Sequence, residues 1–97
     1  MIRHAALFRL IHPAGSPGEH GFFDALTGLA QIPGVTDFAI ARETSPKNPF
    51  TFAVSMTFAD AAAYQAYNDH PAHVAFVRDR WLPEVAEFME HDTVPPN

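Results

Sequence analysis

The clearest hydrophobic pattern in the chain lies in residues 50–58, where apolar and small side chains alternate with period two. The apolar positions are Phe50, Phe52, Val54, Met56 and Phe58. This alternation predicts a β-strand with one strongly apolar face. Weaker alternation predicts three more strands, over residues 3–11, 35–41 and 85–92. In residues 3–11 both parities are largely apolar, which is typical of a strand covered on both sides.

A first helix is predicted over residues 19–30, between the first two strands. Its apolar positions follow the i, i+4, i+7 spacing of one helical face, and they are Phe22, Leu26 and Leu29. The loop HPAGSPG precedes the helix, and Pro33 and Gly34 end it. One face of this helix is therefore expected to be buried.

Proline residues divide the second helical region. Asp60 precedes AAAYQAY and is expected to cap a helix there, because its carboxylate can accept from amides of the first turn. Pro71 biases His70 away from the helical conformation and opens a second short helix, HVAFVRDRW, which Pro83 is expected to end. The segment YNDHPAHVAF therefore spans the end of one helix and the start of the next.

The order of these elements is βαββα(α)β, which predicts a ferredoxin-like α+β fold: a four-stranded antiparallel sheet with the helices on one face. The 97 residues are long enough for one domain, residues 1–97, with a small core. Because the central strands also carry apolar residues on the second face, we expect two protomers to pack sheet to sheet as a homodimer.

Composition and charge narrow the classes of partner. Lys and Arg total six against eleven Asp and Glu, so no basic stripe is available for phosphates and nucleic acid is not an expected partner. The apolar stretch at the N-terminus is too short for a signal peptide or a membrane span, so we expect a cytoplasmic protein with no membrane partner. The lack of cysteine excludes disulfides, thiolate zinc sites and thiol nucleophiles.

Four motifs carry a resemblance to a known family: IRH at the start of the first strand, IPGV after the first helix, SMTFAD at the exit from the third strand, and YNDHPAHVAF. With these motifs the chain resembles the stress-responsive A/B barrel domain (Dabb) family, a branch of the dimeric α/β-barrel superfamily. The resemblance covers nearly the whole chain. It implies a ferredoxin-like protomer whose sheets pair into a homodimeric barrel.

The motif YNDHPAHVAF is also similar to that of a plant polyketide cyclase in this family, which performs an aldol condensation without a cofactor. That resemblance implies that Tyr67 and His73 do the chemistry and that His4 lines the cavity. The chain departs from the cyclase at Phe52, where the cyclase has a pocket histidine. The resemblance therefore implies the fold and the motif, and it does not extend to the substrate.

Proton transfer next to a carbonyl group is the chemistry open to this motif. A neutral imidazole such as His73 can remove a proton from a carbon acid, and a hydroxyl such as that of Tyr67 can stabilise the resulting enolate. The same side chains also suit packing, since His73 can bond a backbone carbonyl and Tyr67 can be a core aromatic. Both interpretations stay open at the level of sequence.

Metal binding is a further interpretation, with His70 and His73 three residues apart and His4 as a third ligand. Pro71 changes the helical phase between the first two, and no carboxylate motif completes the set. We therefore expect no metal and no cofactor, and we expect His70 to cap the helix or to face solvent.

Three functions follow from these patterns. The first is a Dabb protein of undetermined activity that binds a small apolar or aromatic molecule between helices and sheet. The second is a cofactor-free cyclase, lyase or oxygenase with His73 as general base and Tyr67 as oxyanion donor. The third is a structural oligomer with a filled core. The candidate substrate-binding side chains are His4, Phe8, Phe22, Leu26, His70 and Trp81.

Overall fold

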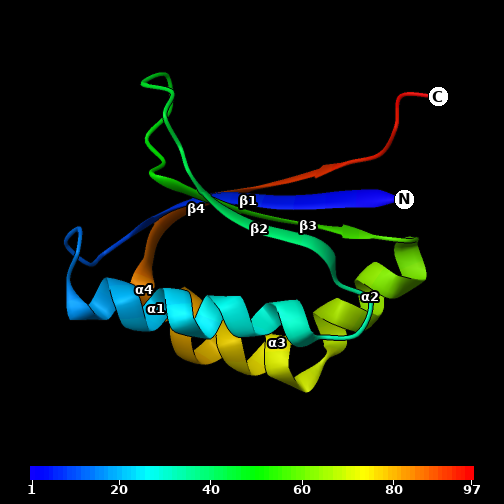
Figure 1. The fold of residues 1–97 in the computed structure, drawn as a ribbon, viewed down its shortest axis with the longest axis horizontal. Coiled ribbons are helices and arrows are strands. Elements are labelled where there is room, and N and C mark those ends of the chain that lie inside the picture. The colour runs from blue at the N-terminus through cyan, green and yellow to red at the C-terminus, as the bar shows by residue number, and fades with distance from the viewer.

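The computed structural model describes residues 1–97. In chain order the elements are β1 (Ile2–Leu10), α1 (Pro17–Thr27), η1 (Gly28–Gln31), β2 (Thr36–Arg42), β3 (Phe52–Phe58), α2 (Ala61–Asp69), α3 (Pro71–Phe76), η2 (Val77–Trp81), α4 (Leu82–Glu84) and β4 (Val85–Thr93). The strands form one antiparallel sheet in the order β2-β3-β1-β4. Figure 1 shows the helices as a layer on one face of this sheet. The predicted ferredoxin-like α+β fold is confirmed.

The register of β1 against its two neighbours decides which side chains face the helices. His4 lies opposite Met56 of β3 and Asp92 of β4, and Ala6 lies opposite Glu90 of β4. Because the side-chain period of a strand is two, these residues all point to the same face of the sheet. The helix layer therefore meets a row of side chains drawn from both ends of the chain.

The opposite face of the sheet carries no helix (Figure 1). Leu7 lies at its centre, opposite Ala53 on β3 and Met89 on β4. Arg3 lies along the same face, and its two Nη atoms donate to the hydroxyls of Thr57 and Ser55 at 3.0 Å each. This face is therefore a mixture of small, apolar and hydrogen-bonded side chains.

Helix α1 begins two residues before its predicted start. Ser16 is its N-cap, with Oγ accepting from the Glu19 amide at 3.3 Å, and Pro17 occupies the first turn, where its missing N–H leaves no bond unmade. The chain then tightens into the 3₁₀ turn η1, which covers the last part of the predicted helix. The prediction missed the serine–proline start signal.

The predicted division of the second helical region is confirmed. Asp60 caps α2, with its Oδ1 accepting from the Ala63 amide at 2.8 Å. Pro71 opens α3, and His70 is extended, with its Nδ1 accepting from the Ala72 amide at 3.1 Å. The expectation that His70 caps a helix is also confirmed.

The predicted helix end at Pro83 is wrong, because the helical chain continues through Pro83 to Glu84. Residues of η2 form a π-helical turn, and the Leu82 amide donates to the Val77 carbonyl five residues back. Pro83 has no N–H to donate, and in a regular α-helix its ring would also clash with the carbonyl four residues back. The wider π turn just before Pro83 departs from that regular geometry.

Aromatic rings fill one end of the space between sheet and helices. Phe8 lies at the centre of this group, with ring centroids 5.8 Å from Phe22, 5.8 Å from Phe52 and 5.1 Å from Trp81. Phe23 packs edge-on against Phe52 at 4.8 Å. We call these five residues the aromatic end.

Candidate functional site

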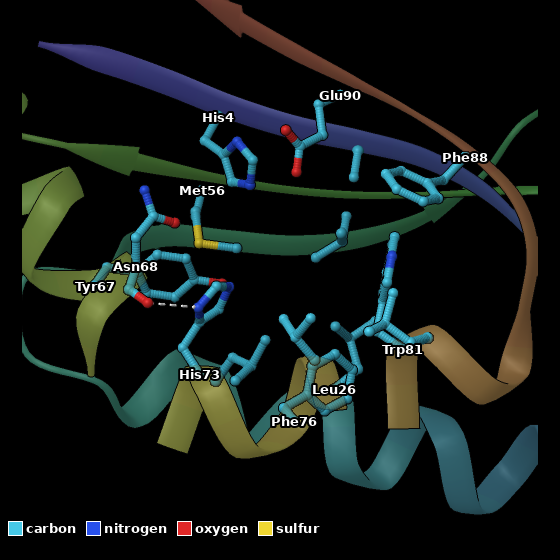
Figure 2. A pocket seen from close by; sticks show the side chains of 15 residues that line it. His4, Leu26, Met56, Tyr67, Asn68, His73, Phe76, Trp81, Phe88 and Glu90 are labelled. Carbon is cyan, nitrogen blue, oxygen red and sulfur yellow. Dashed lines mark hydrogen bonds between the residues drawn. The ribbon is translucent and has the colours of Figure 1, made fainter. Parts of the chain in front are cut away.

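The other end of the same layer holds a cavity of about 230 Å³. Figure 2 shows it between strands β1, β3 and β4 on one side and the helices on the other. Most of its lining is apolar, and the polar side chains that line it include His4, Tyr67, Asn68, His73 and Glu90. The sequence-based alternative of a completely filled core is therefore wrong at this end.

An open depression on the surface adjoins the cavity. It is lined by side chains of α2, α3 and η2, and it shares Asn68, His73, Val77 and Leu82 with the cavity lining. Shared walls place these residues between the cavity and solvent. His73 therefore borders both the cavity and the surface depression.

His73 is oriented by the end of the preceding helix. Its Nδ1 lies 3.1 Å from the carbonyl oxygen of Asn68, and because that oxygen can only accept, Nδ1 carries the hydrogen. The other ring nitrogen, Nε2, then keeps its lone pair and has no protein partner. Burial lowers the pKa of His73, so the ring is neutral at pH 7. The geometry is that of a fixed, neutral imidazole on the cavity wall (Figure 2).

Tyr67 lies in the last turn of α2, on the same wall. Its ring centroid lies 4.4 Å from that of His73 and 5.0 Å from that of Phe58, and the residue is 2% exposed. The hydroxyl makes no hydrogen bond within the protein, yet no buried polar side-chain atom lacks a partner, so the hydroxyl is accessible from the cavity. Burial and the charge of Glu90 raise the pKa of Tyr67, which keeps the hydroxyl protonated as a donor.

His4 reaches the cavity from the sheet. Its Nδ1 lies 2.5 Å from the Asp92 carboxylate, and the Tyr64 hydroxyl donates to the other oxygen of the same carboxylate at 2.9 Å. His4 is 8% exposed, and its Nε2 has no protein partner. The three side chains come from β1, α2 and β4, so tertiary structure alone brings them together.

Glu90 is the charged side chain on the lining, and no Lys or Arg lies there. It shares the helix-facing side of β4 with Phe88 and Asp92. Its carboxylate is exposed to solvent and makes no ion pair in the structure, so it adds one negative charge to the cavity lining.

The structure brings together five of the eight candidate residues. His4, Leu26, Tyr67, His73 and Trp81 all line the cavity. Their functional roles stay predictions, but their convergence on one space is observed.

The other three candidates do not reach the cavity. Phe8 and Phe22 share the sheet–helix layer with it, but each is fully buried in the aromatic end, where neighbouring rings fill the space. His70 is occupied as the cap of α3. No group of three or more His, Asp and Glu side chains is arranged to hold a metal ion.

Sequence reasoning missed Asp92, Glu90 and Tyr64. Asp92 and Glu90 were placed correctly on a strand, and because they are two residues apart they were expected on the same face of it. What the sequence did not contain was the pairing register between β4 and β1, which joins residues 88 positions apart. A prediction that β4 pairs with β1 in this register would have placed Asp92 beside His4 and Glu90 beside Ala6.

The fold and the cavity define this chain as a ferredoxin-like α+β protein with an internal, mostly apolar pocket. The chain belongs to the stress-responsive A/B barrel domain (Dabb) family, whose sequence profile matches residues 2–95. Among functionally curated proteins, none shows significant similarity to it. None of its helices is both long and apolar enough to span a bilayer.

Solved structures agree with this assignment. The chain is 54% identical to a Dabb family protein with a ferredoxin-like fold from Mesorhizobium loti, with a TM-score of 0.96 over 99% of this chain and 97% of the other. It is 28% identical to a dimeric ferredoxin-like protein of unknown function from Thermobifida fusca, with a TM-score of 0.77 over 97% and 90%. A hydroxynitrile lyase from Passiflora edulis is 16% identical, with a TM-score of 0.85 over 99% and 94%, and shares the fold.

Proposed function

We propose that the cavity binds a small, uncharged, largely apolar molecule that carries a carbonyl group. The observation behind this proposal is the Tyr67 hydroxyl, a hydrogen-bond donor without a protein partner at an apolar cavity. A carbonyl oxygen is the acceptor that would complete it. The volume of about 230 Å³ is several times the ~30 Å³ that one water occupies in the liquid.

The charge of the cavity lining further limits which ligands are expected to bind. Glu90 contributes a negative charge to the wall, and no cation compensates it. A free carboxylate in the cavity would lose its hydration and face a like charge. The expected ligands are therefore neutral aromatic ketones and aldehydes rather than the corresponding acids.

A matched pair of ligands tests this proposal. Acetophenone and benzoate have the same ring and similar size, and differ in charge. We expect millimolar acetophenone to raise the thermal midpoint by mass action and benzoate to leave it unchanged. Calorimetric titration of Tyr67→Phe should show acetophenone binding about 5-fold weaker, since about 1 kcal/mol of hydrogen bonding is lost. If no neutral aromatic carbonyl compound binds, the proposal is wrong.

A second candidate is proton transfer without a cofactor, and the tautomer of His73 favours it. With Nδ1 bonded to the Asn68 carbonyl, the Nε2 lone pair is available to a ligand. His73 would take a proton from the carbon next to the carbonyl, and the electron pair would move into an enolate whose oxygen accepts from the Tyr67 hydroxyl. The reverse transfer returns the proton to carbon.

Deuterium exchange separates binding from proton transfer. Acetophenone incubated in D₂O with the protein should lose its methyl proton signal in NMR spectra faster than in buffer alone. His73→Gln should abolish this acceleration and still bind acetophenone. Unchanged exchange in His73→Gln would remove His73 as the base, and binding without exchange in the wild type would leave a binding protein.

We also propose that two copies pack through the helix-free face of the sheet. The support is the apolar centre of that face at Leu7, together with the dimeric state named for the Thermobifida fusca relative. Light scattering should give a dimer at micromolar concentration, and Leu7→Asp should give a monomer. Ile11→Asp is the control, because Ile11 is exposed and lies beyond the end of β1. A monomeric wild type would contradict the proposal.

A further inference from the structure

We propose that the helix-free face of the sheet carries an oxyanion site, formed by Arg3 and the hydroxyls of Ser55 and Thr57, and that this site binds a phosphate group. The site lies on the opposite side of the sheet from the cavity. It takes a charged ligand, whereas the cavity is expected to take a neutral one. The inference therefore goes beyond the proposed function and does not depend on what the cavity binds.

The first argument is the pairing of the cationic side chains. Of the six Lys and Arg residues, Arg9, Arg78 and Arg80 each pair with a carboxylate. Arg3 makes no ion pair, although the chain has eleven Asp and Glu residues. On this face of β1, β3 and β4 the carboxylate is Glu87, and it lies 3.3 Å from Arg9 at the other end of β1. The charge of the Arg3 guanidinium is therefore not compensated within the protein.

The second argument is the support that the sheet gives to this guanidinium. Its Nη1 donates to Oγ1 of Thr57 and its Nη2 to Oγ of Ser55, at 3.0 Å each. Both acceptors lie on β3, which pairs with β1, and Thr57 is only 7% exposed. A long side chain held at two points has lost much of its rotamer freedom before a ligand arrives. The guanidinium is therefore preorganised for binding.

The third argument is the set of donors that the protein leaves unused. The hydroxyls of Ser55 and Thr57 accept from Arg3 and donate to no group in the protein, so each keeps a hydrogen for a ligand. The remaining N–H groups of the guanidinium also have no protein acceptor. Donors gathered around one positive charge, without an acceptor, are what an oxyanion requires, and the guanidinium fork matches phosphate oxygens in pairs.

The surroundings of the site contain further hydroxyls and no carboxylate. Thr57 lies opposite Thr36 on β2, and Arg3 lies opposite Thr93 on β4, so one row across the four strands holds three threonines and the arginine. Asp37 follows in β2 and makes no ion pair with Arg3. A phosphate group offers more acceptor oxygens to this row than a carboxylate does. We therefore expect phosphate to bind more tightly than acetate.

The position of the site keeps it accessible. Arg3 lies near the start of β1, at the end of the sheet where both chain termini are found (Figure 1). The centre of the helix-free face, at Leu7, lies four residues further along the strand. A second copy packed on that centre would leave the site at the margin of the interface. A phosphate group of a larger molecule could therefore bind there as well as the free ion.

Calorimetric titration with inorganic phosphate at constant ionic strength tests the site. We expect the wild type to bind phosphate, and Arg3→Gln to bind it at least about 10-fold more weakly, because charge-assisted hydrogen bonds are lost. Arg3→Lys should also bind more weakly, since it keeps the charge and loses the fork. The chain carries a net charge of −5, so general attraction of anions to its surface is not expected to contribute.

Arg9→Gln is the matched control. It removes one positive charge from the same face of the same strand, but Arg9 pairs with Glu87 and has no hydroxyl partner. It lies roughly 20 Å from Arg3 along the strand, beyond the Debye length of ~8 Å at physiological salt. Arg9→Gln should therefore keep the wild-type affinity for phosphate. An equal loss in Arg9→Gln and Arg3→Gln would mean unspecific attraction and would overturn the inference.

Two further measurements separate the source of the phosphate group and the role of the hydroxyls. Glycerol 3-phosphate should bind more tightly than inorganic phosphate if the ligand is an organic phosphate, and more weakly if it is the free ion, with glycerol as the blank. In ¹⁵N NMR spectra the Arg3 Nε–H signal should shift on addition of phosphate, and Ser55→Ala should reduce the affinity. Absence of binding by both phosphates, or acetate binding as tight as phosphate binding, would show that the inference is wrong.

Discussion

Both ends of the sheet–helix layer lie between the sheet and the helices, but one end is filled with packed rings and the other holds a cavity. At the aromatic end, Phe8 of β1 packs against rings from α1, β3 and η2. Four residues earlier on the same face of β1, His4 meets Met56 and Asp92, and a cavity of about 230 Å³ lies beneath it. The comparison indicates that the packed end supplies stability, while the other end keeps open space between sheet and helices.

Large-to-small substitutions should show this difference most strongly. Phe22→Ala is expected to destabilise the protein by about 3–5 kcal/mol, because a fully buried ring leaves a new void among other rings. Met56→Ala should cost only about 2 kcal/mol, since part of the Met56 surface already faces empty space. Urea unfolding measures both, and equal costs would contradict the contrast.

Small-to-large substitutions should affect the stability of the two ends differently. Ala6→Leu points new atoms into the cavity, so the free energy of unfolding should stay within about 1 kcal/mol of the wild-type value while acetophenone binding is lost. Leu10→Phe is the matched control on the same face of β1, away from the cavity lining. It should cost about 1–3 kcal/mol through overpacking. A large loss in Ala6→Leu would mean that the cavity closes in solution.

The pH dependence of stability should report on the environment of His73 at the cavity. Burial lowers the pKa of His73 below its ordinary value of 6.5, so the unfolded chain binds a proton there before the folded chain does. This contribution makes stability fall as pH decreases below about 6.5, and it is absent at higher pH. The difference in unfolding free energy between pH 8 and pH 5 should therefore be smaller in His73→Gln. An unchanged difference would place His73 in water.

The smallest effect on stability is expected from Tyr67→Phe. The hydroxyl that this change removes has no protein partner, so the free energy of unfolding should change by no more than about 0.5 kcal/mol. A thermal melt is sufficient to check it. A loss well above 1 kcal/mol would mean that the hydroxyl is bonded within the protein rather than open to a ligand.

Local rules carried most of the fold from sequence. Alternation around Val54 and Met56 predicted β3, and Asp60 and Pro71 marked the helix boundaries through capping and a missing amide. Pro83 misled, because a π-helical turn is set by packing and leaves no period in the sequence.

The candidate site also has one part that the sequence could predict and another part that it could not. The motif with Tyr67 and His73 is local, and it could be predicted as a unit. The contact between His4 and Asp92 depends on the register of two strands from opposite ends of the chain, which hydrophobic alternation does not determine. Alternation also tells which side chains point inward, and it does not tell whether they meet. Phe8 and His4 share one parity, yet one is packed and the other borders a void.

The π-helical turn of η2 amounts to one additional residue in an otherwise α-helical rod. Because the wider turn absorbs that residue, removing one residue from 78–80 would restore ordinary α-helical winding and leave the segment that follows in nearly the same orientation. The indole of Trp81, which packs on Phe8 and also lines the cavity, would keep both contacts. The π-helical turn therefore makes this wall of the pocket tolerant of a one-residue change in chain length.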